Sequence, residues 1–403
     1  MTQTIRSREQ AEGYMALVCF KHGPPVLHGI ELEWTVHHGA DPARPTDLET
    51  LRRALGPYAP STLEPPSPRL ALAAGSRVTV EPGGQIEIST LPTPSVVGLI
   101  TAGRADVAHL RLLLAEHGLV LGQRGTDPNR IPQRLLRTPR YDAMEVAFDQ
   151  IGPLGRQMMT ATASAQICVD AGDANDVAAR WQAVHAFGPP LVALFANSPV
   201  LGGRRTGWAS SRLRAVLGMS PPSTSPPAST TDPVGQWVRL ALHARLVCLR
   251  RETGPWTPPP NLTFSDWIAA GVSGAMVAPT YDDLDYHLTT LFPPVRPRGY
   301  LEIRYLDQQP GDSWTAPLAL VAALLATPST VEQATAASER AVGRWVQAAR
   351  DGLGDRVVCR AAVDVVDVGL SSMAHLDLDA AVLSEVTERL SELIAPAMAG
   401  RKT

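Results

Sequence analysis

The sequence predicts an α+β fold in which an antiparallel or mixed β-sheet forms a cradle and helices cover it. Strands are indicated at 28–36 and 76–90, where apolar and polar residues alternate with a period of two. Long amphipathic helices separate such stretches, the clearest of them at 95–118. From about residue 314 the chain is rich in alanine and helical in pattern. We therefore expect a helical C-terminal region, 314–403, packed on the sheet.

The composition is that of a globular chain without an extreme of charge. The 403 residues are 44% hydrophobic and carry a formal net charge of −3, which indicates no binding to nucleic acid or membrane. Only Lys21 and Lys402 are lysines. Cationic contacts to phosphate or carboxylate must therefore come from arginine, whose planar fork binds such groups bidentately. A large sheet with a helical layer can fold as one unit, so we expect residues 1–403 to form a single domain.

Cysteine spacing and the apolar pattern bear on cellular location. Cys19, Cys168, Cys248 and Cys359 are far apart and include no C-x-x-C pair. This spacing fits neither a zinc site nor a disulfide scaffold and is typical of reduced thiols. The first turns carry charges where a signal peptide would be apolar, and no window has the length and composition of a membrane helix. We therefore expect a cytoplasmic protein.

The first expected strand, 28–36, sets two carboxylates side by side. A helix over 7–20, capped by Ser7, precedes it. Period-two geometry places Glu31 and Glu33 on one face of the strand. The apolar residues of the other face are Ile30, Leu32, Trp34 and Val36. Neighbouring like charges repel, and Mg²⁺ would neutralise them, although a solvated face of an antiparallel sheet is the alternative.

A second acidic stretch follows at 76–90. VTVE and QIEIS alternate like two strands, and the PGG between them predicts a turn or a bulge. Gln85 and Glu87 share one face of the second strand, and Glu81 lies at the turn. An ordinary hairpin with polar faces is the alternative. Two acidic strands in one chain favour a common site.

A strand rich in hydroxyl groups is expected at 157–172. Thr160, Thr162 and Ser164 alternate with apolar residues, and the polar face continues to Gln166. Buried hydroxyls need hydrogen-bond partners, so a polar face on a central strand suggests a bound ligand.

The remaining stretches define the later elements. A helix interrupted at GPP is expected over 173–199, and a basic, glycine-containing loop with irregular structure over 202–218. Residues 220–233 are rich in proline and serine and predict a flexible surface loop, either a lid or an insertion. Residues 280–310 predict a helix, a proline-containing loop and a strand on which Glu302 and Arg304 share one face.

Several motifs of other enzyme classes are missing from the sequence. It contains no GxGxxG after a strand, no GxxxxGK[ST], no HExxH and no GxSxG. It offers instead acids from three strands together with an arginine. This set suits phosphoryl transfer, because carboxylates hold Mg²⁺ ions that bridge phosphate oxygens and arginine balances the charge of the transition state.

A series of short stretches occurs in one order between about residues 28 and 307: HGIELEW, VTVEPGGQIEIST, RYDAM, MMTATASAQICVD, LFANSP with the following GW and SSR, YHLTTLFPPVR and GYLEIRYLD. In this order they resemble the glutamate–cysteine ligases of the plant and proteobacterial type. The resemblance implies a sheet related to that of glutamine synthetase. The chain looks more like the actinobacterial branch, whose product feeds ergothioneine synthesis.

The resemblance implies an ATP-dependent reaction. The γ-carboxylate of L-glutamate attacks the terminal phosphate of ATP, and the amine of L-cysteine then attacks the γ-glutamyl phosphate. The products are γ-glutamylcysteine, ADP and phosphate. Two or three Mg²⁺ ions, with Mn²⁺ as an alternative, would clamp the phosphates. The positions matching the family's metal ligands are Glu31, Glu33, Glu87 and Glu302, with Glu81 and Gln166 as additional ligands.

The resemblance also implies the substrate contacts. Arg304 matches the position that holds the transferring phosphate, so Arg304 and Glu302 are the expected catalytic residues, and Gln85 is a second contact to the nucleotide. Arg212 in SSR matches an arginine that would hold the α-carboxylate of glutamate. The other expected substrate contacts are Thr160, Thr162, Asn197 and Trp208 for glutamate and Tyr300 for cysteine. A simple ion pair between Arg304 and Glu302, and solvation of Arg212, are the structural alternatives.

Two other functions are open on the sequence alone. The same fold could join glutamate to a different amine, because acceptor choice depends on a few side chains of the pocket. The chain could also be a non-catalytic member that binds nucleotide as a regulatory subunit, although intact acids on three strands argue against this. Segment 204–214 matches the family less well than its neighbours, and 220–233 has no counterpart. The expected assembly is a monomer or a homodimer.

Overall fold

A six-stranded sheet forms the centre of the structure, a computed structural model that describes residues 3–220, 223–227 and 230–399. The strand order is β3-β4-β1-β6-β10-β9, and every neighbouring pair is antiparallel. The strands of the described chain are β1 His28–Trp34, β2 Val36–His38, β3 Arg77–Val80, β4 Ile86–Ser89, β5 Leu119–Leu121, β6 Ser164–Val169, β7 Val200–Leu201, β8 Arg204–Arg205, β9 Val295–Pro297 and β10 Leu301–Asp307. The expected α+β class is confirmed.

Helices precede, interrupt and follow these strands. The α-helices are α1 Arg8–Cys19, α2 Leu48–Leu55, α3 Val96–Ala115, α4 Pro139–Asp149, α5 Leu154–Ala161, α6 Val177–Ala186, α7 Gly188–Leu194, α8 Ser211–Met219, α9 Pro233–His243, α10 Phe264–Val272, α11 Tyr281–Leu288, α12 Thr315–Leu324, α13 Pro328–Ser338, α14 Trp345–Asp351, α15 Arg356–Ser372 and α16 Ala380–Ala399. Short 3₁₀ turns are η1 Gly56–Tyr58, η2 Glu339–Ala341, η3 Gly352–Gly354 and η4 Met373–His375.

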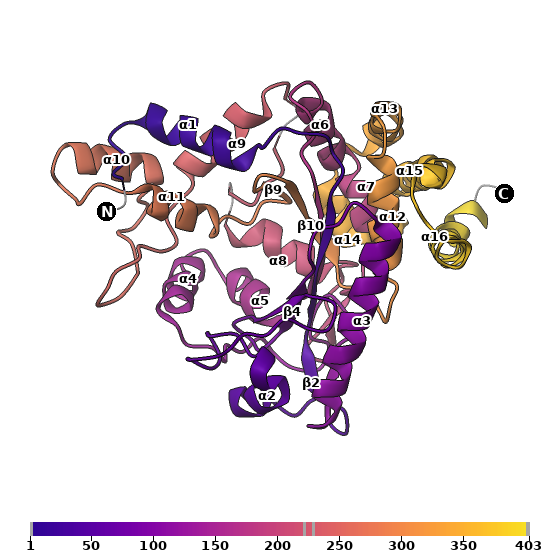
Figure 1. The fold of residues 1–403 in the computed structure, drawn as a ribbon, viewed down its shortest axis with the longest axis horizontal. Helices are drawn as coiled ribbons and strands as arrows, with labels where there is room; N and C mark the ends of the chain where they lie inside the picture. The colour runs from indigo at the N-terminus through magenta and orange to yellow at the C-terminus, as the bar shows by residue number, and fades with distance from the viewer. Residues whose placement is uncertain (1–2, 221–222, 228–229, 400–403) are drawn as a thin grey trace.

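The sheet separates two groups of helices. Figure 1 shows α3 and α12 on one side of it and α4, α5 and α8 on the other. Every residue of α12 is buried, and Tyr305 of β10 packs edge-on against Trp345 of α14 with ring centroids 5.3 Å apart. No single described helix is long and apolar enough to cross a membrane, although α12 and Pro328–Ala341 meet that test as a pair bent by 109°. The hydrophobic face of the sheet is thus covered by the C-terminal helices.

The strand expected over 28–36 has the predicted faces but not the predicted length. The buried apolar residues of β1 are Ile30, Leu32 and Trp34. The chain leaves the main sheet at Thr35, and Val36 begins β2, which pairs with β5. The carbonyl of Thr35 accepts a hydrogen bond from the Gly122 amide, and its hydroxyl bonds to the ring of His37. These bonds satisfy the backbone where the strand breaks.

Helix α5 occupies the first part of the strand expected at 157–172, so that prediction is wrong there. Only the later part of the stretch forms β6. The hydroxyls of Thr160 and Thr162 donate to the carbonyls of Arg156 and Met158, four residues earlier in the chain. Such bonds satisfy the hydroxyls locally, so no continuous hydroxyl face is presented to a ligand.

Two further elements differ from expectation. Helix α8 forms where irregular structure was expected, and the hydroxyl of Ser210 caps it by accepting from the amide of Leu213. Strand β9 forms within the proline-containing loop before β10. The loop expected over 220–233 is described only in part, because 221–222 and 228–229 lie outside the described residues.

Candidate active site

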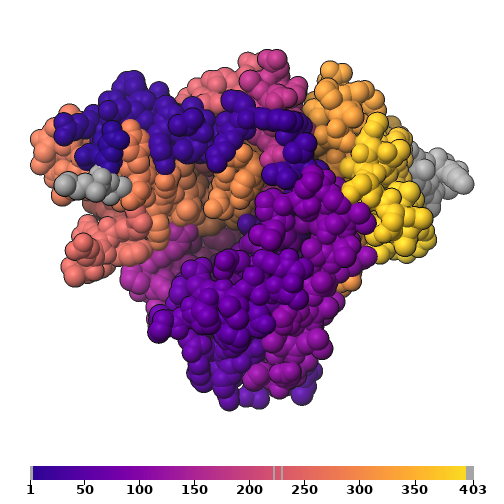
Figure 2. Space-filling view, viewed as in Figure 1, coloured from indigo at the N-terminus to yellow at the C-terminus, as the bar shows by residue number. Residues whose placement is uncertain are grey.

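A cavity of about 400 Å³ lies on the polar face of the sheet. It is enclosed by β1, β4, β6, β9 and β10 and by residues of α4, α5 and α8. In the space-filling view, the surface is hollowed between the orange segment around α11 and the purple segments below it (Figure 2). The charged residues of the cavity wall are Glu31, Glu33, Glu81, Glu87, Arg140, Arg212, Arg296, Arg298 and Arg304.

The strand register gathers the carboxylates on one wall. Glu33 of β1 lies directly opposite Glu87 of β4, and Glu31 lies opposite Gln166 of β6. The oxygens of Glu33 accept hydrogen bonds from the amide and hydroxyl of Ser164, at 2.8 and 2.7 Å, and from Nε2 of Gln166 at 3.0 Å. We call Glu31, Glu33, Glu81 and Glu87 the acidic wall. The ion pairs of this region go instead to Glu302, so the acidic wall has no cationic partner among the described residues.

Burial and mutual repulsion disfavour the ionised form of these carboxyls. Burial, followed by the charge of Glu302, raises the pKa of Glu31 to about 7. Burial and then the charge of Glu33 raise the pKa of Glu81 to about 7. Burial and the charges of the other members raise the pKa of Glu87 well above its usual range. A wall whose buried carboxyls repel one another in this way is electrostatically suited to a divalent cation.

The opposite wall is built around Glu302, whose side chain is fully buried. Arg296 of β9 donates through Nε and Nη2 to its two oxygens, at 2.6 and 3.0 Å. Nη1 of Arg304 donates to Oε1 of the same carboxylate at 2.8 Å. Burial alone would raise the pKa of Glu302, but the charges of Arg296 and Arg304 outweigh it and hold that pKa well below the usual range. Glu302 is therefore ionised and fully paired.

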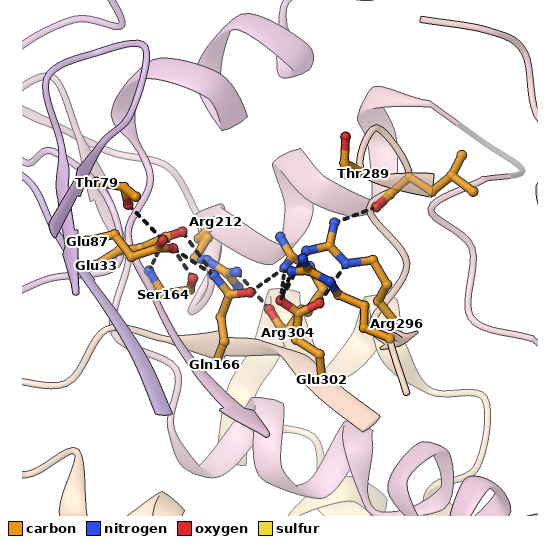
Figure 3. A network of polar contacts seen from close by, with 12 residues as sticks. Glu33, Thr79, Glu87, Ser164, Gln166, Arg212, Thr289, Arg296, Glu302 and Arg304 are labelled. Atoms are coloured by element: carbon orange, nitrogen blue, oxygen red, sulfur yellow. Dashed lines mark hydrogen bonds and ion pairs between the residues drawn. The ribbon is translucent and has the colours of Figure 1, made fainter. Parts of the chain in front are cut away.

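Gln166 connects the two walls (Figure 3). Its Nε2 donates to Glu33, and its Oε1 accepts a short hydrogen bond from Nη1 of Arg304. The side chain of Gln166 thus lies between Glu33 and Arg304, in the middle of the network. Gln166 was expected to ligate a metal, but its oxygen is occupied by Arg304 here.

Arg212 stands out among the cavity arginines because most of its donors are unused. The residue is only 4% exposed. Its Nη2 donates to the carbonyl of Arg304 at 2.7 Å, whereas Nε and Nη1 have no partner within the described part of the chain. A buried cation with unfilled donors is costly unless an anion satisfies it. This guanidinium is therefore suited to a carboxylate ligand.

The structure brings most of the predicted site residues to this cavity. Those in its wall are Glu31, Glu33, Glu81, Gln85, Glu87, Thr162, Gln166, Arg212 and Arg304, and Glu302 is bonded directly to two arginines of the wall. Gln85 was expected to contact the nucleotide, but its side-chain amide forms hydrogen bonds with backbone groups. It donates to the carbonyl of Thr162 at 3.0 Å and accepts from the amide of Gly83 at 2.9 Å. Gln85 therefore ties the β3–β4 turn to the C-terminal end of α5.

Four predicted substrate contacts lie outside the cavity wall: Thr160, Asn197, Trp208 and Tyr300. Thr160 lines a separate cavity. Asn197 donates to two backbone carbonyls and so joins neighbouring loops. The ring of Trp208 lies under the guanidinium of Arg214, and Tyr300 belongs to the turn that precedes β10. These residues are close in sequence to residues of the cavity wall, but they do not line the cavity themselves.

Sequence reasoning missed Arg296, Arg298 and Arg140. The first two lie in the segment PPVRPRGY, where the five residues from Pro293 to Pro297 include three prolines. Proline has no amide hydrogen to donate within a sheet, so its presence predicted a loop here. Proline is nevertheless compatible with an edge strand such as β9. The alternation of arginine across this edge strand was the signal that could have revealed Arg296.

Comparisons with known proteins show to which family the chain is similar. A family model described as glutamate-cysteine ligase family 2 (GCS2) matches residues 27–394. The glutamate–cysteine ligase EgtA of Mycolicibacterium smegmatis is 38% identical over 368 residues, which cover 89% of this chain and 83% of the relative. EgtA of Mycobacterium tuberculosis is 39% identical over 366 residues, or 89% of this chain and 82% of the relative.

More distant proteins share the fold or part of the chain. The chloroplastic glutamate–cysteine ligase of Brassica juncea is 30% identical over 241 residues, which cover 58% of this chain and 46% of the relative. A crystal structure of a bifunctional glutathione synthetase from Pasteurella multocida has a TM-score of 0.50 at 13% identity, over 97% of this chain and 50% of that one. That likeness concerns the fold alone. The resemblance found in the sequence is thus confirmed, and the chain belongs to glutamate-cysteine ligase family 2.

Proposed function

We propose that the chain uses ATP to join the γ-carboxylate of L-glutamate to the amine of L-cysteine, giving γ-glutamylcysteine, ADP and phosphate. The observation that carries the proposal is a single cavity with an acidic wall and an arginine wall, bridged by Gln166, in a chain of this family. Relatives over most of its length are named glutamate–cysteine ligases. We further propose that the product serves ergothioneine synthesis, as the actinobacterial resemblance implies.

The acidic wall fits Mg²⁺, because carboxylate oxygens are the ligands this ion prefers. Among the described residues no group of three His, Cys, Asp or Glu side chains is close enough to hold an ion as it stands. Phosphates and waters would therefore complete the coordination of two or three Mg²⁺ ions, or of Mn²⁺. Glu31, Glu33, Glu81 and Glu87 would hold them. When bound, such ions would neutralise negative charge on the phosphates.

Arg304 would bind the transferring phosphoryl group. Its Nη1 lies between Glu302 and Gln166, so two acceptors fix the direction of the guanidinium. Fixed donors stabilise a transition state more than mobile ones, because they need no reorganisation as charge develops. Glu302 and Gln166 thus position Arg304.

Arg212 would anchor a carboxylate of glutamate. Its free nitrogens and its bond to the backbone of Arg304 place this carboxylate next to the phosphate-binding arginine. Holding glutamate at one end directs its γ-carboxylate toward the phosphate. Thr162, Met144 and Met158 also line the cavity and would limit the length of the acid that fits.

The test is turnover with a panel of amines. Purified chain is supplied with ATP, Mg²⁺ and L-glutamate, and ADP release and the ligated product are measured for L-cysteine and other amino acids. We expect ligation to L-cysteine. Turnover with another amine and none with cysteine would show a ligase with a different acceptor. Nucleotide binding without ADP release would favour a regulatory member. The single domain over 1–403, the cytoplasmic location and a monomeric or homodimeric state stay predictions.

A further inference from the structure

Glu302 differs from the other acids of the site in that arginines engage both of its oxygens. Arg296 engages both of its oxygens, and Arg304 engages one of them again. A third arginine, Arg298, lies 3.9 Å from Oε1. Bidentate arginine–carboxylate pairs are among the stronger polar contacts in proteins, and this one is buried. A divalent cation approaching Glu302 is therefore repelled by the positive charges of these arginines.

The acidic wall is in the opposite condition. Its four carboxylates form no ion pair with an arginine of the described residues, and Glu33 and Glu87 face each other across neighbouring strands. A divalent cation gains electrostatic energy there without displacing another cation. The acidic wall is thus electrostatically favourable for a divalent cation and Glu302 is not, although all five acids were expected to bind metal.

We propose that Arg296 is a positioning residue that shields Glu302 from divalent cations until the polyphosphate of the nucleotide is bound. This rests on the proposed function. The phosphates offer Arg296, which lies in the cavity wall, a new anionic partner. Arg304 keeps its bond to Oε1 of Glu302, and the departure of Arg296 frees Oε2 for an ion held jointly with the nucleotide. The acidic wall fills first, and Glu302 binds metal only in the nucleotide complex.

The surroundings of Arg296 allow this exchange. A second cavity of about 230 Å³ also borders Arg296 and Arg298, so the guanidinium has space in which to move. Its strand, β9, is at the edge of the sheet and is held by a partner on one side only. Nη1 of Arg296 makes one long bond, 3.3 Å, to the carbonyl of Leu291. Its main attachment is therefore Glu302 itself.

The experiment counts Mn²⁺ ions on the full chain by electron paramagnetic resonance, without glutamate or cysteine. Wild type should bind fewer Mn²⁺ ions alone than with a non-hydrolysable ATP analogue. Arg296→Gln should bind the additional ion without nucleotide, with affinity raised about tenfold or more over wild type, because a buried positive charge beside Glu302 is gone. Arg296→Lys, which keeps the charge but loses the bidentate fork, should fall between them.

Arg344→Gln is the matched control, because it removes an arginine–aspartate pair, with Asp355, among the C-terminal helices. Its Mn²⁺ binding should equal that of wild type. An unchanged isotherm in Arg296→Gln would overturn the shield. So would a wild-type chain that binds its full complement of Mn²⁺ without nucleotide, and this result does not depend on how well the variants fold. If that same wild type forms γ-glutamylcysteine, the shield fails while the proposed function stands.

Discussion

Glu33 and Glu87 place two carboxylates directly opposite each other on β1 and β4. Like charges in this arrangement destabilise a sheet. The hydrogen bonds from Ser164 and Thr79 orient the oxygens but supply no positive charge. A residue that lowers the stability of its own sheet is retained for what it binds. The acidic wall therefore links function to a measurable loss of stability.

Glu87→Gln should raise the melting temperature of the metal-free protein by a few degrees. The raised pKa of Glu87 means that folding disfavours its ionised form, so the gain should appear above pH 4.5, the ordinary carboxyl value, and increase as pH rises toward the raised pKa. The same change should lower kcat by about 10²–10⁴, because a phosphate-clamping group is lost. Thermal melts in EDTA and ADP release measure the two effects. Glu116→Gln, at the exposed end of α3, should change neither. A lower melting temperature for Glu87→Gln would contradict the repulsion.

Arg212→Lys should raise KM for glutamate by about 10²-fold or more, because lysine replaces a planar fork with a single point of charge. KM for ATP should change much less. Steady-state kinetics with each substrate varied in turn give the comparison. Arg214→Gln alters an arginine of the same helix that lies over Trp208, so it controls for damage to α8. Equal loss of affinity for ATP and glutamate would show that Arg212 does not serve glutamate alone.

At the scale of elements, the period of two was enough to find the acidic strands and their faces. Glu31, Glu33, Glu87, Glu302 and Arg304 reach the site because alternation fixes direction once a strand is known. Helix α5 could not be found in this way, since threonine among alanine and methionine fits helix and strand alike. The sequence also did not show the interaction partners of individual side chains. It did not indicate that Gln85 hydrogen-bonds to the backbone or that Arg296 pairs with Glu302.

The β3–β4 turn offers a test at this scale. A Cβ on Gly83 would lie 2.1 Å from the carbonyl oxygen of Thr160 and 2.7 Å from Oε1 of Gln85. Gly83→Ala should therefore push the turn away from the end of α5, destabilise the protein by about 1–3 kcal/mol and lower activity by displacing Glu87. Gly13→Ala is the control, because a Cβ there meets nothing within 4 Å and favours α1. Calorimetry should show opposite shifts in melting temperature for the two variants. An unchanged melting temperature for Gly83→Ala would mean that the turn is not in close contact with α5.

At the scale of the whole molecule, the two faces of the sheet have different roles: one forms the candidate active site, and the other forms the hydrophobic core with the helices. One face carries the cavity, and the other packs on helices that include α12, every residue of which is buried (Figure 1). Tyr305 and Ile303 point to the helical side from the same strand that presents Glu302 and Arg304 to the cavity. Substitutions in the core on the helical side of the sheet should therefore lower activity only by unfolding the protein.

Leu320→Ala tests that separation. Leu320 is fully buried in α12 and lies against the position of Gly369 in α15. Its truncation leaves a cavity and should cost about 2–5 kcal/mol of unfolding free energy. Below the melting transition, KM for ATP, glutamate and cysteine should stay within about twofold of wild type, because distant sites act independently. Leu383→Ala on α16, where the side chain is 37% exposed, should lower stability much less. Chemical denaturation and steady-state kinetics on the same preparations give both quantities. A folded Leu320→Ala protein with a greatly raised KM for one substrate would show instead that the C-terminal helices set the geometry of the cavity through the sheet.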